Sequence, residues 1–128
     1  MPVYTPAEIH RAFTDAFNAG DLDALLALYE PEAAVVPQPG QMVSGLAAIR
    51  EVLAAFLALR GTIAMTTRTV ITVDDLASLN AEWTIDGTGP DGSSVALAGR
   101  TCEVARRQGD GTWRYVIDNP FSVDAPQA

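Results

Sequence analysis

Residues 46–73, LAAIREVLAAFLALRGTIAMTTRTVITV, contain the change of pattern that decides the fold. Before Gly61 the apolar residues recur at the spacing of one helical face. These residues are Leu46, Ile49, Leu53, Phe56 and Leu57. Gly61 ends this helix, and the stretch after it is rich in Thr, Val and Ile, which favour strands. The sequence therefore predicts helices before Gly61 and a sheet after it.

Two further helices are predicted upstream of this point. The stretch TPAE, residues 5–8, is typical of a helix start, and Gly20 ends the helix that follows it. Asp21 caps the next helix, whose apolar stripe runs as far as Tyr29. Residues 33–45, AAVVPQPGQMVSG, then predict two short strands around a turn rich in Pro and Gly.

Four strand-like runs follow Gly61, and the turn sequences DD, GTGPDGS and QGDG separate them. Turns of this kind favour antiparallel hairpins. The runs are residues 62–73, 77–86, 94–107 and 112–119. Helices followed by hairpins predict an α+β fold in a single domain spanning residues 1–128. In it, three N-terminal helices pack on a strongly curved antiparallel sheet that forms a cone with an internal pocket.

The charge balance argues against two classes of partner. Sixteen acidic against eight basic residues give a net charge of −8, which repels phosphate backbones and anionic lipids. We therefore expect no nucleic acid and no membrane among the partners. The lone cysteine, Cys102, and a start without a cationic and then apolar leader favour the cytoplasm. We expect Cys102 to be a small buried residue and His10 to lie on the surface, with no metal site and no cofactor.

Three stretches resemble a known superfamily. They are GDLDALLALYEPEAAVV, SGLAAIREVL and GRTCEVARRQGDGTWRYVIDNPF, residues 20–36, 44–53 and 99–121. With the order of the elements, they resemble the superfamily of nuclear transport factor, ketosteroid isomerase and SnoaL-like polyketide cyclases. The DGTWRYVIDNPF ending is similar to the SnoaL-like branch. The resemblance implies a cone-shaped fold, a deep pocket and a homodimer through the outer face of the sheet.

The resemblance also provides a test for one particular chemistry. Ketosteroid isomerases use an aspartate base, and they hold an oxyanion with a tyrosine and a protonated acid. Aligned on the Gly-Asp pair after the first helix, the base position falls at Pro37 and the tyrosine position at Phe13. Only the acid position keeps a suitable residue, Glu103. The alignment therefore implies that the chain is not a true ketosteroid isomerase.

Asp118 and Glu103 are the candidate catalytic residues, because they lie on consecutive predicted strands joined by the QGDG turn. One register sets Glu103 opposite Val116 and Thr101 opposite Asp118, so that the two acids share the pocket face as diagonal neighbours. A register shifted by one residue instead sets Arg100 opposite Asp118 as an ion pair, with Glu103 on the other face. The first register makes a coupled acid pair, in which one carboxyl group keeps its proton to higher pH.

Five residues are candidates for ligand binding: Phe13, Tyr29, Trp83, Thr101 and Val116. Tyr29 has a second interpretation as a core tyrosine with a satisfied hydroxyl, which we favour. Trp83 could form a wall of the pocket, pack under the helices or contact a partner subunit. Trp113 and Tyr115 alternate with Val116, so we assign them to the outer face, where a partner subunit would cover them.

Two functions of different classes remain open. The first is a cofactor-free enzyme that does acid–base chemistry, of the isomerase, cyclase, dehydratase or hydrolase type, on a small apolar organic substrate. The second is a non-catalytic ligand-binding or structural dimer of the same fold. Carboxylates in an apolar cavity are costly without a use, which favours the enzyme.

Overall fold

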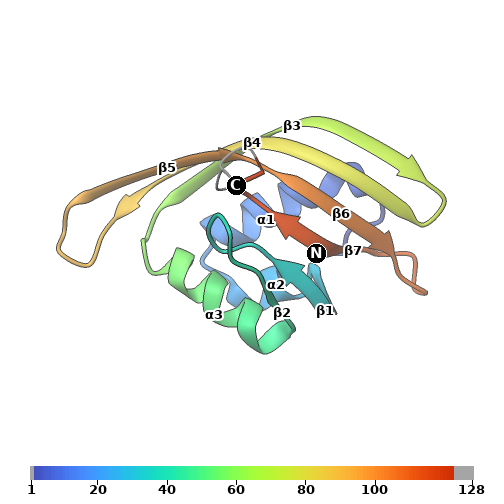
Figure 1. Cartoon of the computed structure of the whole chain (residues 1–128), viewed down its shortest axis with the longest axis horizontal. Helices are drawn as coiled ribbons and strands as arrows, with labels where there is room; N and C mark the ends of the chain where they lie inside the picture. Colours follow the sequence, from blue (N-terminus) through green and yellow to red (C-terminus); the bar gives the residue numbers. More distant parts are fainter. Residues whose placement is uncertain (1, 123–128) are drawn as a thin grey trace.

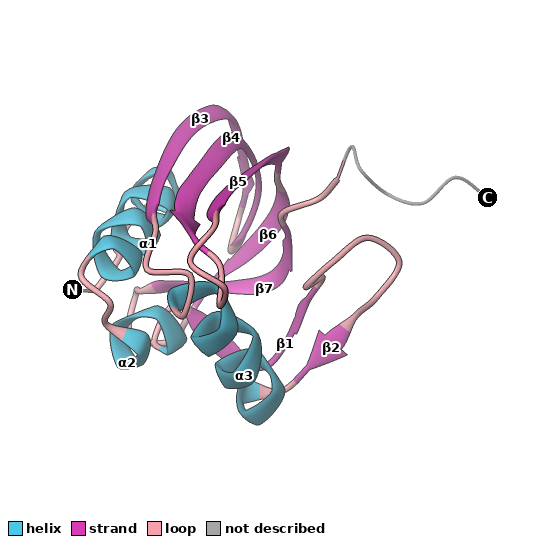
Figure 2. Ribbon diagram, turned by 90° about the vertical axis from the view of Figure 1, so that its left-hand side faces the viewer, coloured by secondary structure: helices cyan, strands magenta, loops and turns pink. Residues whose placement is uncertain are grey.

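The computed structural model describes residues 2–122 and has the predicted α+β class, with three helices against a curled, unclosed sheet (Figure 1). The helices are α1 (Ile9–Asn18), preceded by a 3₁₀ turn (Pro6–Glu8), α2 (Leu22–Leu26) and α3 (Leu46–Leu57). The strands are β1 (Tyr29–Val35), β2 (Val43–Ser44), β3 (Thr62–Val73), β4 (Leu76–Thr88), β5 (Ser94–Arg100), β6 (Cys102–Arg107) and β7 (Trp113–Asn119). In the side view, the sheet is strongly curved, and the helices lie on its concave side (Figure 2).

The strand order is β2-β1-β7-β6-β4-β3, and β5 pairs with the other half of β4. All pairs are antiparallel except β1 and β7, which run parallel, so the sheet is mixed. The sequence predicted a wholly antiparallel sheet because turn signals report only on consecutive strands. The parallel pair joins strands from opposite ends of the chain, and no local turn connects them.

The second helix is shorter than predicted, since α2 ends at Leu26 and Tyr29 begins β1. Its start is as expected, because the Asp21 side chain accepts a 3.0 Å hydrogen bond from the backbone N–H of Ala24. Pro31 lies inside β1, where it can donate no ladder hydrogen bond. The pairing of β1 with β7 is irregular in this region, between Tyr29 and Ala34.

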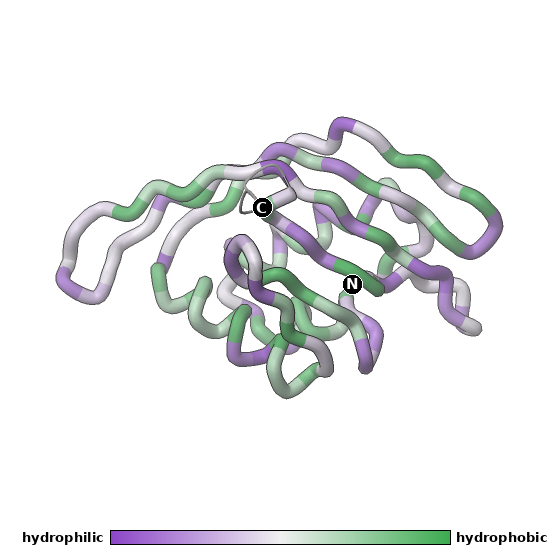
Figure 3. Tube along the Cα trace, in the orientation of Figure 1, coloured by the Kyte–Doolittle hydropathy of each residue, from purple (hydrophilic) through white to green (hydrophobic). Residues whose placement is uncertain are grey.

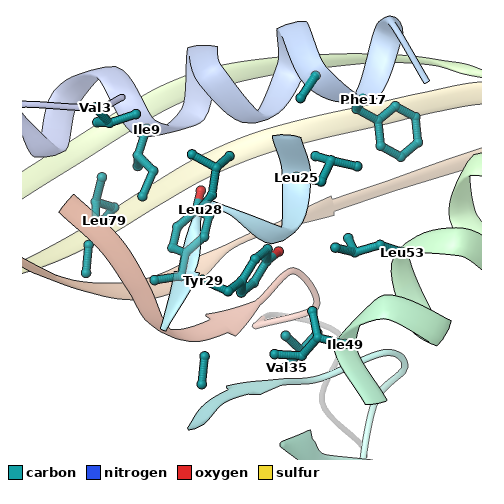
Figure 4. Packing of buried hydrophobic residues seen from close by; sticks show 14 of the residues in the cluster. Val3, Ile9, Phe17, Leu25, Leu28, Tyr29, Val35, Ile49, Leu53 and Leu79 are labelled. Atoms are coloured by element: carbon teal, nitrogen blue, oxygen red, sulfur yellow. The ribbon is translucent and has the colours of Figure 1, made fainter. Parts of the chain in front are cut away.

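The core lies between the helices and the concave face of the sheet (Figure 4). Ile9 and Phe17 of α1 and Ile49 and Leu53 of α3 point toward it. Along the strands, hydrophobic and hydrophilic residues alternate (Figure 3). In β4 this alternation buries every second side chain, namely Ala77, Leu79, Ala81, Trp83 and Ile85. The concave face is therefore apolar, so a polar group on it is an exception that requires explanation.

A β-bulge in β7 determines which side chains reach the concave face. The pairing is Val104 with Ile117 and Ala105 with Tyr115, so Val116 is an extra residue in β7. A bulge of this kind shifts the alternation of side chains by one residue. Tyr115 and Asp118 are consequently both buried, although regular alternation would put them on opposite faces.

Both predicted registers are wrong. Beside the turn, Arg107 pairs with Trp113, which is already one residue away from the first predicted register, and the bulge adds one more residue to that shift. Glu103 pairs directly with Asp118 instead of with Val116, and Arg100 pairs with Glu82 of β4 instead of with Asp118. Trp113 and Tyr115 were assigned to the outer face and are instead buried. Cys102 was expected to be buried and is exposed, because its neighbour Glu103 faces inward. The large apolar side chains exposed on the outer face are instead Ile71, Val73, Leu76 and Ile117.

Candidate functional site

A cavity opens between the helices and the concave face of the sheet. It comprises about 550 Å³ of atom-free space, counting its open mouth, of which about 50 Å³ can take the centre of a water-sized molecule. Its walls are mainly apolar, with Phe13 and Phe17 of α1, Phe56 of α3 and Trp83 of β4 among them. Four lining residues carry side-chain oxygen atoms: Thr101, Glu103, Tyr115 and Asp118. The cavity therefore combines an apolar wall with a compact polar patch, which is the usual composition of small-molecule sites.

Glu103 and Asp118 form the centre of the polar patch. They are paired residues on the adjacent antiparallel strands β6 and β7, which brings their Cα atoms within about 5.5 Å. Both side chains are buried, with 2% and 7% of their surface exposed. Burial and the Glu103 charge raise the pKa of Asp118 to about 7, and a hydrogen bond from Tyr29 opposes that rise. Asp118 is therefore poised to gain or lose a proton near neutral pH.

The hydroxyl group of Tyr29 holds Asp118 from the first strand. It donates a 2.5 Å hydrogen bond to Asp118 Oδ2. Tyr29 is completely packed in the core, and burial, followed by the charge of Asp118, raises its pKa well above the usual value. Tyr29 is therefore a core tyrosine with a satisfied hydroxyl, which is the favoured interpretation. It does not line the cavity, but its hydroxyl group contacts Asp118, which does.

The His10 side chain of α1 contacts the carboxyl group of Glu103. His10 Nε2 lies 2.6 Å from Glu103 Oε1, and His10 Nδ1 lies 2.8 Å from the hydroxyl oxygen of Thr67 on β3. The prediction that His10 lies on the surface is wrong, since only 3% of it is exposed. One signal for this was present, because His10, Phe13 and Phe17 have the i, i+3, i+7 spacing of one helical face.

Thr101 gives Glu103 a second, fixed donor. Thr101 lies between β5 and β6, and its Oγ1 accepts a 2.8 Å hydrogen bond from the backbone N–H of Ala81. The hydroxyl proton is therefore directed to Glu103 Oε1, at 2.6 Å. Asn80 completes the arrangement by donating from its side chain to the Thr101 carbonyl oxygen at 2.8 Å. At the break between β5 and β6, the Thr101 hydroxyl group thus accepts from the backbone of one strand and donates to the carboxyl group of Glu103.

Tyr115 is the polar cavity residue that the sequence interpretation missed. Its ring packs beside that of Tyr29, with centroids 5.2 Å apart, and only 1% of the residue is exposed. Within residues 2–122, no group accepts a hydrogen bond from its hydroxyl. Burial, followed by the charges of Glu103 and Asp118, raises its pKa well above the usual value. Tyr115 therefore stays a neutral phenol near neutral pH.

The other predicted ligand contacts fall into two groups. Phe13, Trp83 and Thr101 line the cavity, whereas Val116 is the bulge residue and lies outside the lining. Trp83 is held by a 2.6 Å hydrogen bond from its indole N–H to the Pro120 carbonyl oxygen. Ligand binding by these residues stays a prediction, and so does catalysis by Glu103 and Asp118.

Glu82 takes no part in the acid pair of the cavity. It forms ion pairs with Arg68 and, at 3.6 Å, with Arg100. Within the part of the chain that the structure describes, no group of three His, Cys, Asp or Glu side chains is arranged to hold a metal ion. No helix among residues 2–122 is both long and apolar enough to cross a membrane.

Comparison with known proteins identifies relatives of this fold. The profile of the SnoaL-like domain family matches residues 10–116, whereas no curated protein matches the chain. A ketosteroid isomerase-like protein from Erwinia carotovora atroseptica superposes with a TM-score of 0.77 at 20% identity, over 88% of this chain and 89% of that one. A proposed dehydratase of the NTF2-like family from Streptomyces avermitilis gives 0.73 at 21% identity, over 88% and 90%. A proposed aromatic ring hydroxylase from Novosphingobium aromaticivorans gives 0.71 at 24% identity, over 88% and 82%. At these identities the likeness establishes a shared fold.

Proposed function

The chain belongs to the SnoaL-like domain family, which has a small-molecule-binding fold, and we propose that its cavity does cofactor-free acid–base chemistry on a small apolar organic molecule. One observation carries this proposal. Glu103 and Asp118 are paired across β6 and β7 inside an apolar cavity, and each has its own hydrogen-bond partners. Two buried carboxyl groups at such short range are costly in a purely structural role, because like charges in a poorly hydrated space oppose each other.

The two carboxyl groups have different roles in this proposal. Asp118 is the proton donor and acceptor, since its pKa of about 7 suits proton transfer in either direction near neutral pH. Glu103 supplies the neighbouring charge that keeps the proton on Asp118, and His10 and Thr101 fix its position. A proton moved to or from a carbon or oxygen atom of the substrate accounts for isomerase, cyclase, dehydratase and hydrolase chemistry alike.

The small volume of the cavity limits the substrate to a molecule of modest size. Room for about 50 Å³ of water-molecule centres is several times what one bound water needs. A small ring or short chain therefore fits, and larger molecules require the open mouth. Phe13 lines the cavity and Pro37 does not, and neither side chain can transfer a proton, so we expect no isomerisation of an enone steroid.

Proton exchange into small carbon acids tests the proposal without knowledge of the substrate. The protein is incubated in D₂O with a panel of small cyclic ketones and lactones, and deuterium incorporation at carbon is followed by NMR. We expect exchange above the buffer rate for at least one compound, and we expect it to fall to background in Asp118→Asn.

Asp74→Asn is the matched control, because Asp74 is exposed and its backbone has a positive φ of 52°, which asparagine tolerates. No exchange with any compound, or equal exchange in Asp118→Asn, would contradict acid–base catalysis at this site.

The small size of the cavity favours a second candidate, a non-catalytic ligand-binding or structural dimer. In that case a ligand would be retained in native mass spectrometry without any exchange activity.

We also propose that the chain is a homodimer in the cytoplasm. Its interface would use the exposed Ile71, Val73 and Leu76 on the outer face of the sheet, and light scattering that gives a monomer at micromolar concentration would contradict it.

A further inference from the structure

Tyr115 lines the cavity, and its buried hydroxyl group has no hydrogen-bond partner among residues 2–122. We infer that the ligand of this cavity is a neutral molecule with an apolar body and one hydrogen-bond-accepting oxygen, and that this oxygen binds the Tyr115 hydroxyl. The inference rests on the proposed use of the cavity as a ligand site. It adds the chemical class of the ligand and the group that orients it.

The comparison with Tyr29 shows why the free hydroxyl is informative. The two tyrosines are paired across β1 and β7, and their rings are in contact. The Tyr29 hydroxyl has a partner in Asp118, whereas the Tyr115 hydroxyl has none among residues 2–122. Glu103 lies near enough to add a weak hydrogen-bond contribution to the raised pKa of Tyr115, but the two groups form no full hydrogen bond. One of its oxygens, Oε1, already receives hydrogen bonds from His10 and Thr101. Buried hydroxyl groups nearly always have a partner, so an unpaired one that lines a cavity indicates where a ligand atom belongs.

The surroundings define what that ligand atom is. Tyr115 stays protonated, so it presents a donor, and its partner must be an acceptor such as a carbonyl, ether or hydroxyl oxygen. Glu103 and Asp118 repel an anion, which excludes a carboxylate or phosphate at this position. The remaining walls, among them Phe13, Phe17 and Trp83, can only contact an apolar body. The class is therefore a neutral, mainly apolar compound with one oxygen acceptor.

A matched pair of probes tests this class directly. Cyclopentanone and methylenecyclopentane have nearly the same shape, and only the ketone has an acceptor oxygen. Their dissociation constants are measured by NMR titration of the wild-type protein. We expect the ketone to bind about tenfold more tightly, which is the usual effect of one buried hydrogen bond. Tyr115→Phe should abolish that preference while binding of the hydrocarbon is retained.

Tyr4→Phe is the matched control, because Tyr4 is exposed and does not line the cavity. Tyr115→Phe should fold at least as stably as the wild type, since it removes a buried hydroxyl group that has no hydrogen-bond partner in the described part of the chain. A second measurement needs no variant: the ¹³Cζ resonance of labelled Tyr115 should shift with the ketone and not with the hydrocarbon.

Four results would overturn the inference. They are equal affinities for the two probes, no binding of either, a preference that persists in Tyr115→Phe, and tighter binding of cyclopentylamine than of the ketone, which would indicate a cation site. The outcome is separable from that of the proposed function. Ketone preference without proton exchange contradicts only the catalytic proposal, and exchange without ketone preference contradicts only this inference.

Discussion

Tyr115 and Asp118 project into the same cavity from one strand, although they are three positions apart and a regular strand would separate them. The extra residue Val116 makes this possible, because the bulge shifts the alternation between them. A neutral hydroxyl donor and a carboxyl group with a raised pKa therefore lie on one wall. The chemistry of the cavity depends on this local irregularity as much as on the residues themselves.

The titration of Asp118 should report its surroundings in two directions. We expect its carboxyl ¹³C resonance to titrate at about pH 7 in the wild type. Glu103→Gln should lower that pKa, since the neighbouring charge raises it, and Tyr29→Phe should raise it further, since the lost hydrogen bond lowers it. Asp74→Asn should leave the titration unchanged. A midpoint that stays the same in Glu103→Gln would show that the two carboxyl groups are not coupled.

His10 should be essential to stability because it is the buried partner of Glu103. Removing His10 takes one of two hydrogen-bond partners from the buried Glu103 carboxyl group, so His10→Phe should lower the free energy of unfolding by about 3 kcal/mol. The double variant His10→Phe/Glu103→Leu should recover most of that loss. Urea unfolding at pH 7 measures both. Thr67→Val, which removes only the outer contact of the histidine, should cost less than His10→Phe.

Much of the architecture could be predicted from periodicity alone. The break at Gly61, the cap at Asp21 and the hairpins after residue 62 are local signals, and the structure has all of them. Turn and strand patterns also place Glu103 and Asp118 on consecutive strands, and the structure pairs them there.

The details of the site could not be found in this way. No residue type announces the bulge at Val116, so Tyr115 was placed on the wrong face. The ladder between β1 and β7 joins distant segments, so nothing local predicts that Tyr29 reaches Asp118. His10 had the correct helical spacing, but a polar residue beside Arg11 is usually solvated, and its buried partner lies 93 positions away.

Gly99 should be required for the close approach of Trp83 to Pro120. A Cβ atom at this position would lie 2.7 Å from the Pro120 carbonyl oxygen and 2.9 Å from the Trp83 indole nitrogen. Gly99→Ala should therefore disrupt the hydrogen bond between these two groups and destabilise the fold by about 1–3 kcal/mol. Thermal unfolding and tryptophan fluorescence measure the effect. Gly109→Ala is the matched control, since a Cβ atom there meets nothing within 4 Å, and an equal loss in both variants would contradict this account.

Asp118 should make the fold less stable as the pH rises, and the sign follows from its raised pKa. Its pKa is about 7 in the folded chain and near 3.9 when unfolded, so between these values the folded state binds more protons. The free energy of unfolding therefore falls from about pH 4 to about pH 7, by at most a few kcal/mol from this group, and its contribution is constant above pH 7. Asp118→Asn removes this pH-dependent contribution and keeps a hydrogen-bond acceptor for the Tyr29 hydroxyl group. In urea unfolding, the stability of the variant relative to the wild type should rise between pH 4.5 and pH 8, while Asp74→Asn stays parallel to the wild type. A difference that does not change with pH would mean that burial leaves the protonation of Asp118 unperturbed.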